Sequence, residues 1–471
     1  MWQEVPSQSD LSAAQAKLKS TRNRRDQPEI GGSLKTFAGY TKSLWWIGVL
    51  WAAAHPTSAD DWPQWRGPRR DGIWRETGVV ERFSSKQLRP VWRVSIGSGY
   101  CGPTVAHGRV YVADRQVDPK QIERVHCFDA ATGKKVWSFE YDCPYTDVSY
   151  DAGPRGSISV DDGRAFALGT MGNLYAFDAA TGQVRWQHDL SKEYRIRMPV
   201  WGISASPVVE KDLLIVQIGG EDGACVVAFD KTDGREKWRA LDDGASYAAP
   251  IVIDQAGRRV LVVYTGEAVV GLNLANGNEY WRYPFPATRM VIGIATPVVH
   301  GDFLFLSNFF DGSLLLKLGQ DEPTIEKVWH RVGASEKKTD ALQSLISTPY
   351  LKGDYIYGVD SYGELRCLEL LTGKRVWESA KAVPRARWST IHIVENRDKV
   401  WMFNERGELI IAKLSPSGYE EIDRTKLIEP TLDQLRKRGG ACWSHPAFAN
   451  GHVFIRNDKE LLCADLRAAK R

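Results

Sequence analysis

Several sequence features that would indicate a catalytic site, a metal site or a strongly charged partner are missing from this chain. The formal net charge is only +4 over 471 residues, which is too small to predict binding to nucleic acid or to a membrane surface. The seven cysteines include neither an adjacent pair nor a Cys-x-x-Cys, so the usual zinc and dithiol motifs are excluded. There is also no Gly-x-Ser-x-Gly and no phosphate-binding glycine loop, and the nine histidines form no pair at helical metal-ligand spacing. The sequence therefore predicts no catalytic residue and no metal site.

Long apolar runs are scarce as well. The run "LWWIGVLWAAA" (Leu44–Ala54) follows lysines and precedes small residues, and it is too short to cross a bilayer comfortably. We interpret residues 35–59 as a secretory signal peptide cleaved near Ala59, with an uncleaved membrane anchor as the alternative. Residues 1–34 are polar and aperiodic, and are either disordered or a mis-assigned start. The prediction is an exported chain, periplasmic or envelope-associated, with no stable membrane span after cleavage.

Tryptophan and glycine, by contrast, are abundant. The chain has 18 Trp and 42 Gly, a combination that favours short strands joined by tight turns. A phrase recurs in which an Asp-like residue stands four positions before a Gly and a Trp four positions after it. Its five copies are Asp129/Gly133/Trp137, Asp178/Gly182/Trp186, Asp230/Gly234/Trp238, Asn273/Gly277/Trp281 and Glu369/Gly373/Trp377. Trp92 and Trp329 lie in similar strand contexts, and successive tryptophans from Trp92 to Trp377 are 43 to 52 residues apart, which is typical of propeller blades.

Each residue of the phrase has a structural role that its chemistry predicts. The Gly supplies the positive φ of a short hairpin loop. The Asp or Asn side chain accepts hydrogen bonds from free backbone N–H groups at the turn. The Trp, once per blade on the outermost strand, is a flat side chain large enough to bury roughly 150–250 Å² against the neighbouring blade. We therefore expect these tryptophans to dock the sheets into a ring.

The openings of the units give the number of blades. Eight strand openings follow small residues, at Pro103, Ile158, Pro207, Pro250, Pro297, Pro349, Ile391 and Pro446. The seventh unit has no docking Trp, and the eighth stops after three strands. The missing strand is available in "PVWRVSIG" around Trp92, and using it removes the exposed edges. The sequence predicts an all-β, eight-bladed β-propeller over residues 88–471, closed by an N-terminal strand, monomeric, and preceded by a Trp-rich clasp (residues 60–87).

The phrase Ala-x-Asp-x-x-x-Gly-x-x-x-Trp, complete at Ala176–Trp186 and Ala228–Trp238, resembles the tryptophan-docking repeat of PQQ-type β-propellers. That family includes quinoprotein alcohol dehydrogenases and the non-enzymatic propeller of the outer-membrane assembly machinery. The stretch "DWPQWRGPRRDG" (Asp61–Gly72) resembles the leader of exported PQQ-like propellers of planctomycete-type bacteria. The absence of any Trp-Asp dipeptide argues against a WD-type propeller.

The resemblance leaves two functions open. One is an exported, non-catalytic scaffold of the cell envelope that binds proteins, peptides or a polymer. The alternative is a dehydrogenase that depends on PQQ and calcium, a family typically marked by an adjacent cysteine pair and a carboxylate and amide set for calcium. This sequence has no such cysteine pair, and no calcium set can be placed on the repeat, so we predict no cofactor. Fold analogy by itself does not establish an enzyme.

The cysteines fall into two groups. Cys127, Cys367 and Cys463 share one repeat position that elsewhere holds small residues, and we predict that they are compact core side chains. Cys101 and Cys442 lie in inter-blade loops of the first and last blades, where a disulfide between them remains open.

The loops between blades are basic and aromatic, whereas the loops between the second and third strands are acidic. Acidic residues there include Glu221, Asp222, Asp311 and Glu364. We predict a ligand face that takes a peptide or an anionic polymer. The alternative is that these loops simply carry solvated charge. His392 and His445 open strands near the predicted axis, and we interpret them as hydrogen-bonded lining residues. The candidate ligand-face residues are Arg155, Arg197, Trp201, Arg289, Arg387, Trp388 and Trp443.

Overall fold

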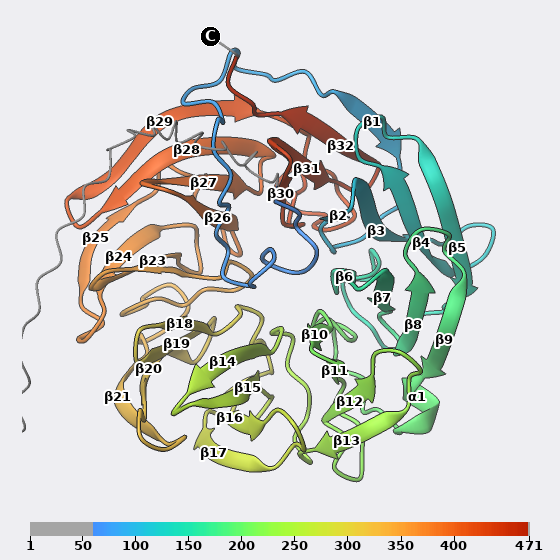
Figure 1. Cartoon of the computed structure of the whole chain (residues 1–471). Helices are drawn as coiled ribbons and strands as arrows, with labels where there is room; N and C mark the ends of the chain where they lie inside the picture. The colour runs from blue at the N-terminus through green and yellow to red at the C-terminus, as the bar shows by residue number, and fades with distance from the viewer. Residues whose placement is uncertain (1–59, 470–471) are drawn as a thin grey trace, which may run out of the picture. The chain divides into compact units, whose positions relative to one another are not determined.

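The computed structural model describes residues 60–469, so the predicted signal peptide (35–59) and residues 1–34 lie outside the described part. Eight four-stranded antiparallel sheets surround a central axis (Figure 1). The predicted all-β, eight-bladed propeller is thereby confirmed. Among the described residues the single helix is α1 (Leu190–Glu193), which is four residues long. Within residues 60–469, no helix has the length and apolar character needed to cross a membrane.

Each blade of the first half opens with a short inner strand and ends with an outer strand at the rim. Blade 1 contains β2 (Thr104–Ala106), β3 (Arg109–Gln116), β4 (Ile122–Asp129) and β5 (Lys135–Asp142). Blade 2 contains β6 (Ser159–Asp161), β7 (Arg164–Leu168), β8 (Asn173–Asp178) and β9 (Val184–Asp189). Blade 3 contains β10 (Val208–Glu210), β11 (Leu213–Gln217), β12 (Val226–Asp230) and β13 (Glu236–Ala240). Blade 4 contains β14 (Ile251–Gln255), β15 (Arg258–Tyr264), β16 (Ala268–Asn273) and β17 (Glu279–Pro284).

The second half repeats this order until the last blade. Blade 5 contains β18 (Val298–His300), β19 (Phe303–Asn308), β20 (Gly312–Leu318) and β21 (Ile325–Arg331). Blade 6 contains β22 (Tyr350–Lys352), β23 (Tyr355–Val359), β24 (Leu365–Glu369) and β25 (Arg375–Ser379). Blade 7 contains β26 (Ile391–Asn396), β27 (Lys399–Asn404), β28 (Glu408–Ser415) and β29 (Gly418–Lys426). Blade 8 contains β30 (Ala447–Ala449), β31 (His452–Arg456), β32 (Glu460–Asp465) and, from the start of the described chain, β1 (Trp92–Ser95).

The ring closes as the sequence predicted. Strand β1 pairs antiparallel with β32, with Trp92 opposite Cys463 and Ser95 opposite Glu460. Figure 1 shows the blue strand β1 directly beside the red strand β32. Because the two ends of the propeller share one sheet, opening the ring requires breaking a ladder of backbone hydrogen bonds.

The repeated phrase forms the hairpin between the third and fourth strands. In blade 2, Gly182 has φ +75°, and the Asp178 carboxylate accepts the backbone N–H of Thr181 at 2.9 Å. The pairing slips by one residue between Ala176 and Phe177, beside the pair Ala176–Trp186. This bulge recurs in every blade that has its own complete hairpin and increases the local twist.

The small-residue position of the repeat lies opposite the docking Trp. Cys127 faces Trp137, Cys367 faces Trp377 and Cys463 faces Trp92, and all three thiols are buried in the core, as predicted. In blade 4 the position is Gly271, where a Cβ would lie 2.2 Å from the ring of Trp281. This repeat position holds only small side chains because the indole ring packs directly over it.

The docking tryptophans reach from one blade to the next. Six of them donate the indole N–H to a backbone carbonyl of the following blade: Trp92 to Ala130, Trp137 to Ala179, Trp186 to Lys231, Trp238 to Leu274, Trp329 to Leu370 and Trp377 to Ser415. The glycine of the next hairpin is the seat of the ring: a Cβ on Gly182 would lie 2.5 Å from Trp137. The same contact joins Gly133 to Trp92, Gly234 to Trp186, Gly277 to Trp238 and Gly373 to Trp329. These glycines thus have a second role, in packing, that the sequence argument did not include.

Two seams depart from this pattern. Trp281 donates its N–H to Gln255 Oε1 in its own blade, since blade 5 lacks the phrase that would seat it. Blade 7 has no docking Trp, and its seam with blade 8 contains Trp74 of the clasp instead. The Trp74 ring lies 5.3 Å from Trp401 of blade 7 and 5.0 Å from Phe448 of blade 8.

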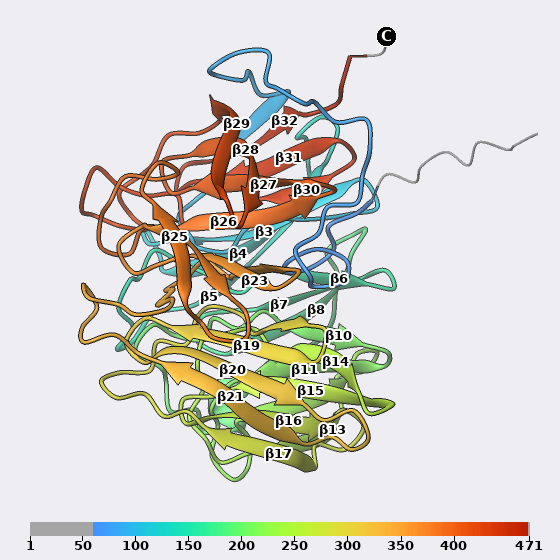
Figure 2. The ribbon, with the colours of Figure 1, turned by 90° about the vertical axis from the view of Figure 1, so that its left-hand side faces the viewer.

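The clasp runs across the central axis of the propeller, at the end where the first and second strands of each blade are joined by a turn (Figure 1). It bridges to blade 1 at Trp62–Val105, to blade 7 at Ile73–Glu395 and to the segment after β32 at Val79–Arg467. The Arg70 guanidinium donates to the carbonyls of Pro207 and Pro250, in blades 3 and 4. Figure 2 shows the clasp, in blue, along one side of the ring.

The cysteine pair left open by the sequence is not bonded. Cys101 Sγ donates to the carbonyl of Ala113 at 3.1 Å, and Cys442 Sγ donates to the carbonyl of Glu429 at 3.5 Å. All seven cysteines lie within the described residues and all are free and buried. Burial raises the pKa of the Cys442 thiol to about 12, so it is protonated at neutral pH.

Candidate functional site

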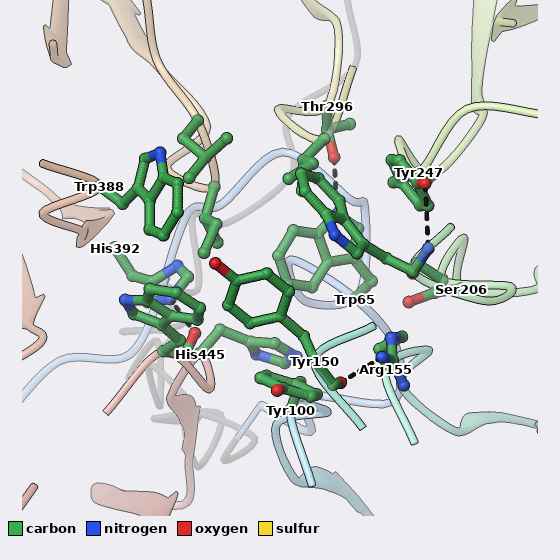
Figure 3. A pocket seen from close by; sticks show the side chains of 17 residues that line it. Trp65, Tyr100, Tyr150, Arg155, Ser206, Tyr247, Thr296, Trp388, His392 and His445 are labelled. Atoms are coloured by element: carbon green, nitrogen blue, oxygen red, sulfur yellow. Dashed lines mark hydrogen bonds between the residues drawn. The ribbon is translucent and has the colours of Figure 1, made fainter. Parts of the chain in front are cut away.

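All eight inter-blade loops converge on one pocket of about 150 Å³ at the axis (Figure 3). Each loop contributes the residue three positions before its blade opening. Around the ring these are Tyr100, Arg155, Ser204, Tyr247, Ile294, Ile346, Trp388 and Trp443. We call these eight residues the axial ring. The repeat therefore specifies the position of the lining residues, while their chemistry varies from blade to blade.

Aromatic side chains dominate the lining. Three neighbouring members of the axial ring, Trp388, Trp443 and Tyr100, come from the openings of blades 7, 8 and 1. The rings of Tyr100 and Trp443 are stacked, with centroids 6.4 Å apart. Tyr150 and Trp201 add two more rings from the loops that lead into blades 2 and 3. The pocket thus offers mostly ring faces and carbon to an occupant.

The clasp supplies Trp65 at the inner end of the pocket. Its indole N–H donates to Thr296 Oγ1 of the axial wall at 2.9 Å. Its ring meets that of His445 edge to face at 4.5 Å. Trp65 therefore ties a segment outside the repeat to blades 5 and 8. The sequence argument placed tryptophans in the clasp but gave no sign of which one would reach the axis.

Two buried histidines lie beside Trp65. His392 Nε2 is 2.9 Å from the carbonyl of Trp443, and His445 Nε2 is 2.6 Å from Ser157 Oγ. Burial, together with the charge of Arg66, lowers the pKa of His392 to about 4. Burial and the neighbouring His392 lower the pKa of His445 to about 3. Both side chains are neutral at pH 7 and are held by hydrogen bonds within the lining.

Arg155 is the charged member of the axial ring. Its guanidinium donates to the carbonyls of Gly153 (2.6 Å), Ser149 (3.1 Å) and Tyr150. The guanidinium carbon also lies 5.0 Å from the centre of the Tyr100 ring. The charge of Arg155 is therefore engaged in holding its own loop rather than pointing freely into the cavity.

The candidate ligand-face residues separate into two groups in the structure. Arg155, Trp201, Trp388 and Trp443 line the pocket. Arg197, Arg289 and Arg387 lie outside it: Arg197 donates to the carbonyl of Asp242 at 3.3 Å, Arg289 stacks on Phe310 at 5.0 Å, and Arg387 pairs with Glu336 at 2.7 Å.

The acidic loops meet the basic ones in ion pairs. Arg195 pairs with Glu221 at 2.7 Å, Arg385 with Glu364 at 2.6 Å, and Arg438 with Glu405 at 2.6 Å. Asp311 accepts the backbone N–H of Thr288 at 3.0 Å. The cationic inner loops and the acidic rim expected from the sequence therefore neutralise each other in part, through ion pairs across the loops.

The pocket residues do not fit a calcium-bound quinone. Calcium takes several oxygen ligands, usually including carboxylates. No Asp or Glu is among the lining residues of the pocket. Across residues 60–469, no group of three or more His, Cys, Asp or Glu side chains is placed to hold a metal ion.

Comparison with known proteins agrees with the fold. The family described as outer membrane protein assembly factor BamB matches residues 76–145, 121–379 and 338–471. The chain belongs to this family. BamB of Shewanella oneidensis is 25% identical over 230 residues, 47% of this chain and 56% of that protein. BamB of Xanthomonas campestris pv. campestris is 26% identical over 255 residues, 53% of this chain and 61% of that protein. The chain thus spans less than two thirds of the length of these two relatives.

The family resemblance extends to quinoproteins. The quinoprotein alcohol dehydrogenase PedH of Pseudomonas putida is 26% identical over 294 residues, 57% of this chain and 46% of that protein. Among solved structures, BamB from Moraxella catarrhalis superposes with a TM-score of 0.55 at 17% identity, over 82% of this chain and 99% of that chain. A europium-containing methanol dehydrogenase gives 0.61 at 14% identity, over 84% and 89%. At these identities the structural likeness shows the PQQ-type propeller fold.

Proposed function

We propose that this chain is an exported, non-catalytic scaffold of the bacterial cell envelope that binds a partner protein with its inter-blade loops. The observation that carries the proposal is the convergence of all eight inter-blade loops on one aromatic pocket. A surface built from every blade at once gives a partner a rigid, concave target, because each loop is held by the sheets on either side. Membership of the BamB family supports an envelope location and a protein partner.

The charges of the loops favour a protein partner over an anionic polymer. A polyanion would need several arginines free to pair with it. Arg385, Arg387 and Arg438 already pair with carboxylates of this chain, and Arg155 is bound to backbone carbonyls. The ring faces of Trp388, Trp443 and Trp201 are, by contrast, the kind of surface on which protein partners are anchored.

Site-specific photo-crosslinking in the native host tests the proposal. A photoreactive phenylalanine at Met290, in the exposed loop between blades 4 and 5, is expected to capture defined exported proteins. The matched control is Lys211, in the exposed turn between β10 and β11 at the opposite end of the blades, where we expect no such product. The same products from both positions, or none from Met290, would contradict the proposal.

The dehydrogenase alternative has its own assay. Purified protein is mixed with PQQ and calcium, and quinone absorbance and dye-linked alcohol oxidation are measured. We expect neither bound quinone nor oxidation, because the pocket lacks the carboxylates that calcium requires. Stoichiometric quinone together with alcohol-dependent dye reduction would replace the scaffold function by an enzymatic one.

A further inference from the structure

The central pocket is selective in charge. Its one charged lining side chain, Arg155, is engaged by three backbone carbonyls, and no carboxylate faces the cavity. A cation would meet the guanidinium without any opposing carboxylate, and an anion would find that guanidinium already bound. The pocket chemistry therefore selects a neutral occupant.

Several polar atoms of the wall are already paired, although the buried indole N–H of Trp443 has no hydrogen-bond partner. Ser206 Oγ accepts the backbone N–H of Ser157 at 2.9 Å, Thr296 Oγ1 accepts the Trp65 indole at 2.9 Å, and the Tyr247 hydroxyl accepts the backbone N–H of Trp201 at 3.2 Å. A sugar ring presents many hydroxyl groups, each of which loses water on entering such a pocket. An apolar or aromatic group loses little, and it gains the ring faces. The wall thus favours an aromatic group over a carbohydrate.

The size of the cavity limits the occupant to one small aromatic group. With Tyr150 in place, the free volume of about 150 Å³ is large enough for one benzene-sized molecule, and a larger aromatic group such as an indole needs the Tyr150 ring to move. A larger cofactor or a folded segment would not fit without rearrangement. One aromatic side chain of a protein fits both the volume and the chemistry.

One of the side chains that line this cavity, Tyr150, lies against three tryptophans of the wall. Tyr150 reaches in from the loop before blade 2, and its ring centroid lies 5.8 Å from Trp201, 6.0 Å from Trp388 and 6.1 Å from Trp443. Figure 3 shows this ring in the middle of the labelled side chains. Its backbone has φ +55°, a left-handed conformation that a Tyr rarely adopts. Arg155 binds the carbonyls of Ser149 and Tyr150 and so holds this loop in place.

We infer that the pocket is a socket for one aromatic side chain, presented by an extended segment of a partner protein, and that Tyr150 is the gate which this side chain displaces. The inference rests on the proposed function, since it names the part of the partner that the loop face binds. Tyr150 is the lining residue expected to give way, because its left-handed backbone is a conformation that a tyrosine rarely adopts. Trp388, Trp443 and Trp201 now lie beside the Tyr150 ring, and they would contact the incoming side chain in its place.

The test uses a small aromatic probe, so it needs no partner. Binding of 5-fluoroindole to the purified full-length chain is followed by fluorine NMR. Tyr150→Gly removes the competing ring and fits a positive φ, and it is expected to tighten binding about fivefold, the order of one aromatic contact. Trp388→Ala removes a wall of the socket and is expected to weaken binding about fivefold. Tyr355→Ala, a half-buried tyrosine of blade 6 outside the pocket, is the matched control and should leave binding unchanged.

Opposite signs for Tyr150→Gly and Trp388→Ala are the decisive result. If Tyr150→Gly weakens binding or leaves it unchanged, Tyr150 is not a gate and the inference fails. If methyl α-glucoside binds and 5-fluoroindole does not, the pocket is a carbohydrate site and the inference fails as well. Crosslinks from Met290 without any 5-fluoroindole binding would overturn the socket while leaving the scaffold function intact. Binding of 5-fluoroindole without crosslinks would support the socket and count against the scaffold.

Discussion

The seam between blades 2 and 3 and the seam between blades 7 and 8 close the same ring by different means. In the first, Trp186 of β9 lies on Gly234 and donates its N–H to the carbonyl of Lys231 at 3.2 Å. In the second, blade 7 offers no such Trp, and Trp74 of the clasp packs between Trp401 and Phe448. Adjacent blades seal the first seam with their own repeat. The second depends on a segment from far away in the chain.

The two seams should therefore fail differently. A repeat-built seam loses one contact when its Trp is removed, since the strands on either side remain in their own sheets. The clasp-built seam also holds the floor of the pocket, because the same segment carries Trp65. Replacing Trp74 is therefore expected to disturb the packing of the axial pocket as well as that of the seam.

Replacing Trp74 is expected to be the most damaging change. The side chain is 1% exposed, and Trp74→Ala leaves a cavity between two blades. We expect the free energy of unfolding to fall by about 4 kcal/mol, the usual range for a buried Trp. Urea unfolding at pH 7, followed by circular dichroism, measures it. A loss of less than about 1 kcal/mol would show that the clasp does not stabilise this seam.

Trp186→Ala is the matched change in a repeat-built seam. The side chain is 9% exposed and makes one N–H bond to the next blade. We expect a loss of about 3 kcal/mol in the same urea experiment, with 5-fluoroindole binding unchanged. Trp74→Ala should in addition weaken 5-fluoroindole binding. Equal effects of the two variants on binding would remove the distinction between the seams.

Low pH is expected to lower the free energy of unfolding through two histidines, one from blade 7 and one from the loop before blade 8. His392 of blade 7 and His445 before blade 8 have pKa values lowered to about 4 and about 3, so the folded protein keeps them neutral while the unfolded chain protonates them near pH 6.5. Unfolding therefore takes up protons, and stability falls as the pH falls through this window. Together the two side chains should cost about 2 kcal/mol between pH 6 and pH 5.

The double variant His392→Asn, His445→Asn isolates this contribution. Its free energy of unfolding should change less between pH 6 and pH 5 than that of the natural chain, in parallel urea titrations. The carboxylates, which titrate in both proteins, cancel in the difference. An identical pH dependence would mean that the histidines do not govern the acid response of the protein.

The smallest expected effect separates packing from backbone strain within one blade. Gly182 and Gly163 both have positive φ, +75° and +69°, but a Cβ on Gly182 would meet Trp137 whereas a Cβ on Gly163 meets nothing within 4 Å. Gly163→Ala should cost about 1 kcal/mol from strain, and Gly182→Ala about 1 kcal/mol more from the displaced indole. Thermal or urea unfolding measures the difference. Equal losses would show that the glycine is not the seat of the Trp.

The repeat made much of the fold predictable. Spacing around Gly182 and its equivalents fixed the hairpins, and the eight openings fixed the blades and the closure by Trp92. The axial ring was readable in the same way, because Tyr100, Tyr247 and Trp443 all stand three residues before an opening. The sequence argument found Trp388 and Trp443 through the composition of their loops, and it missed the tyrosines because a single Tyr does not stand out in a loop.

The clasp was not predictable in this way. Trp65 bonds to Thr296, 231 residues away, and Trp74 meets Trp401 and Phe448. No periodicity links such pairs. Nothing in the sequence therefore indicated that Trp65 would reach the axial pocket or that Trp74 would pack between blades 7 and 8. The ion pairs of the loops, such as Arg387 with Glu336, are equally invisible until neighbouring loops are in place.

Local pattern decided the strands, the turns and the number of blades, because hairpin geometry depends on residues a few positions apart. The tertiary structure alone decided what the axis contains. Eight loops that are separate in the chain meet there, and the chemistry of the pocket is the sum of side chains that become neighbours only when the ring closes.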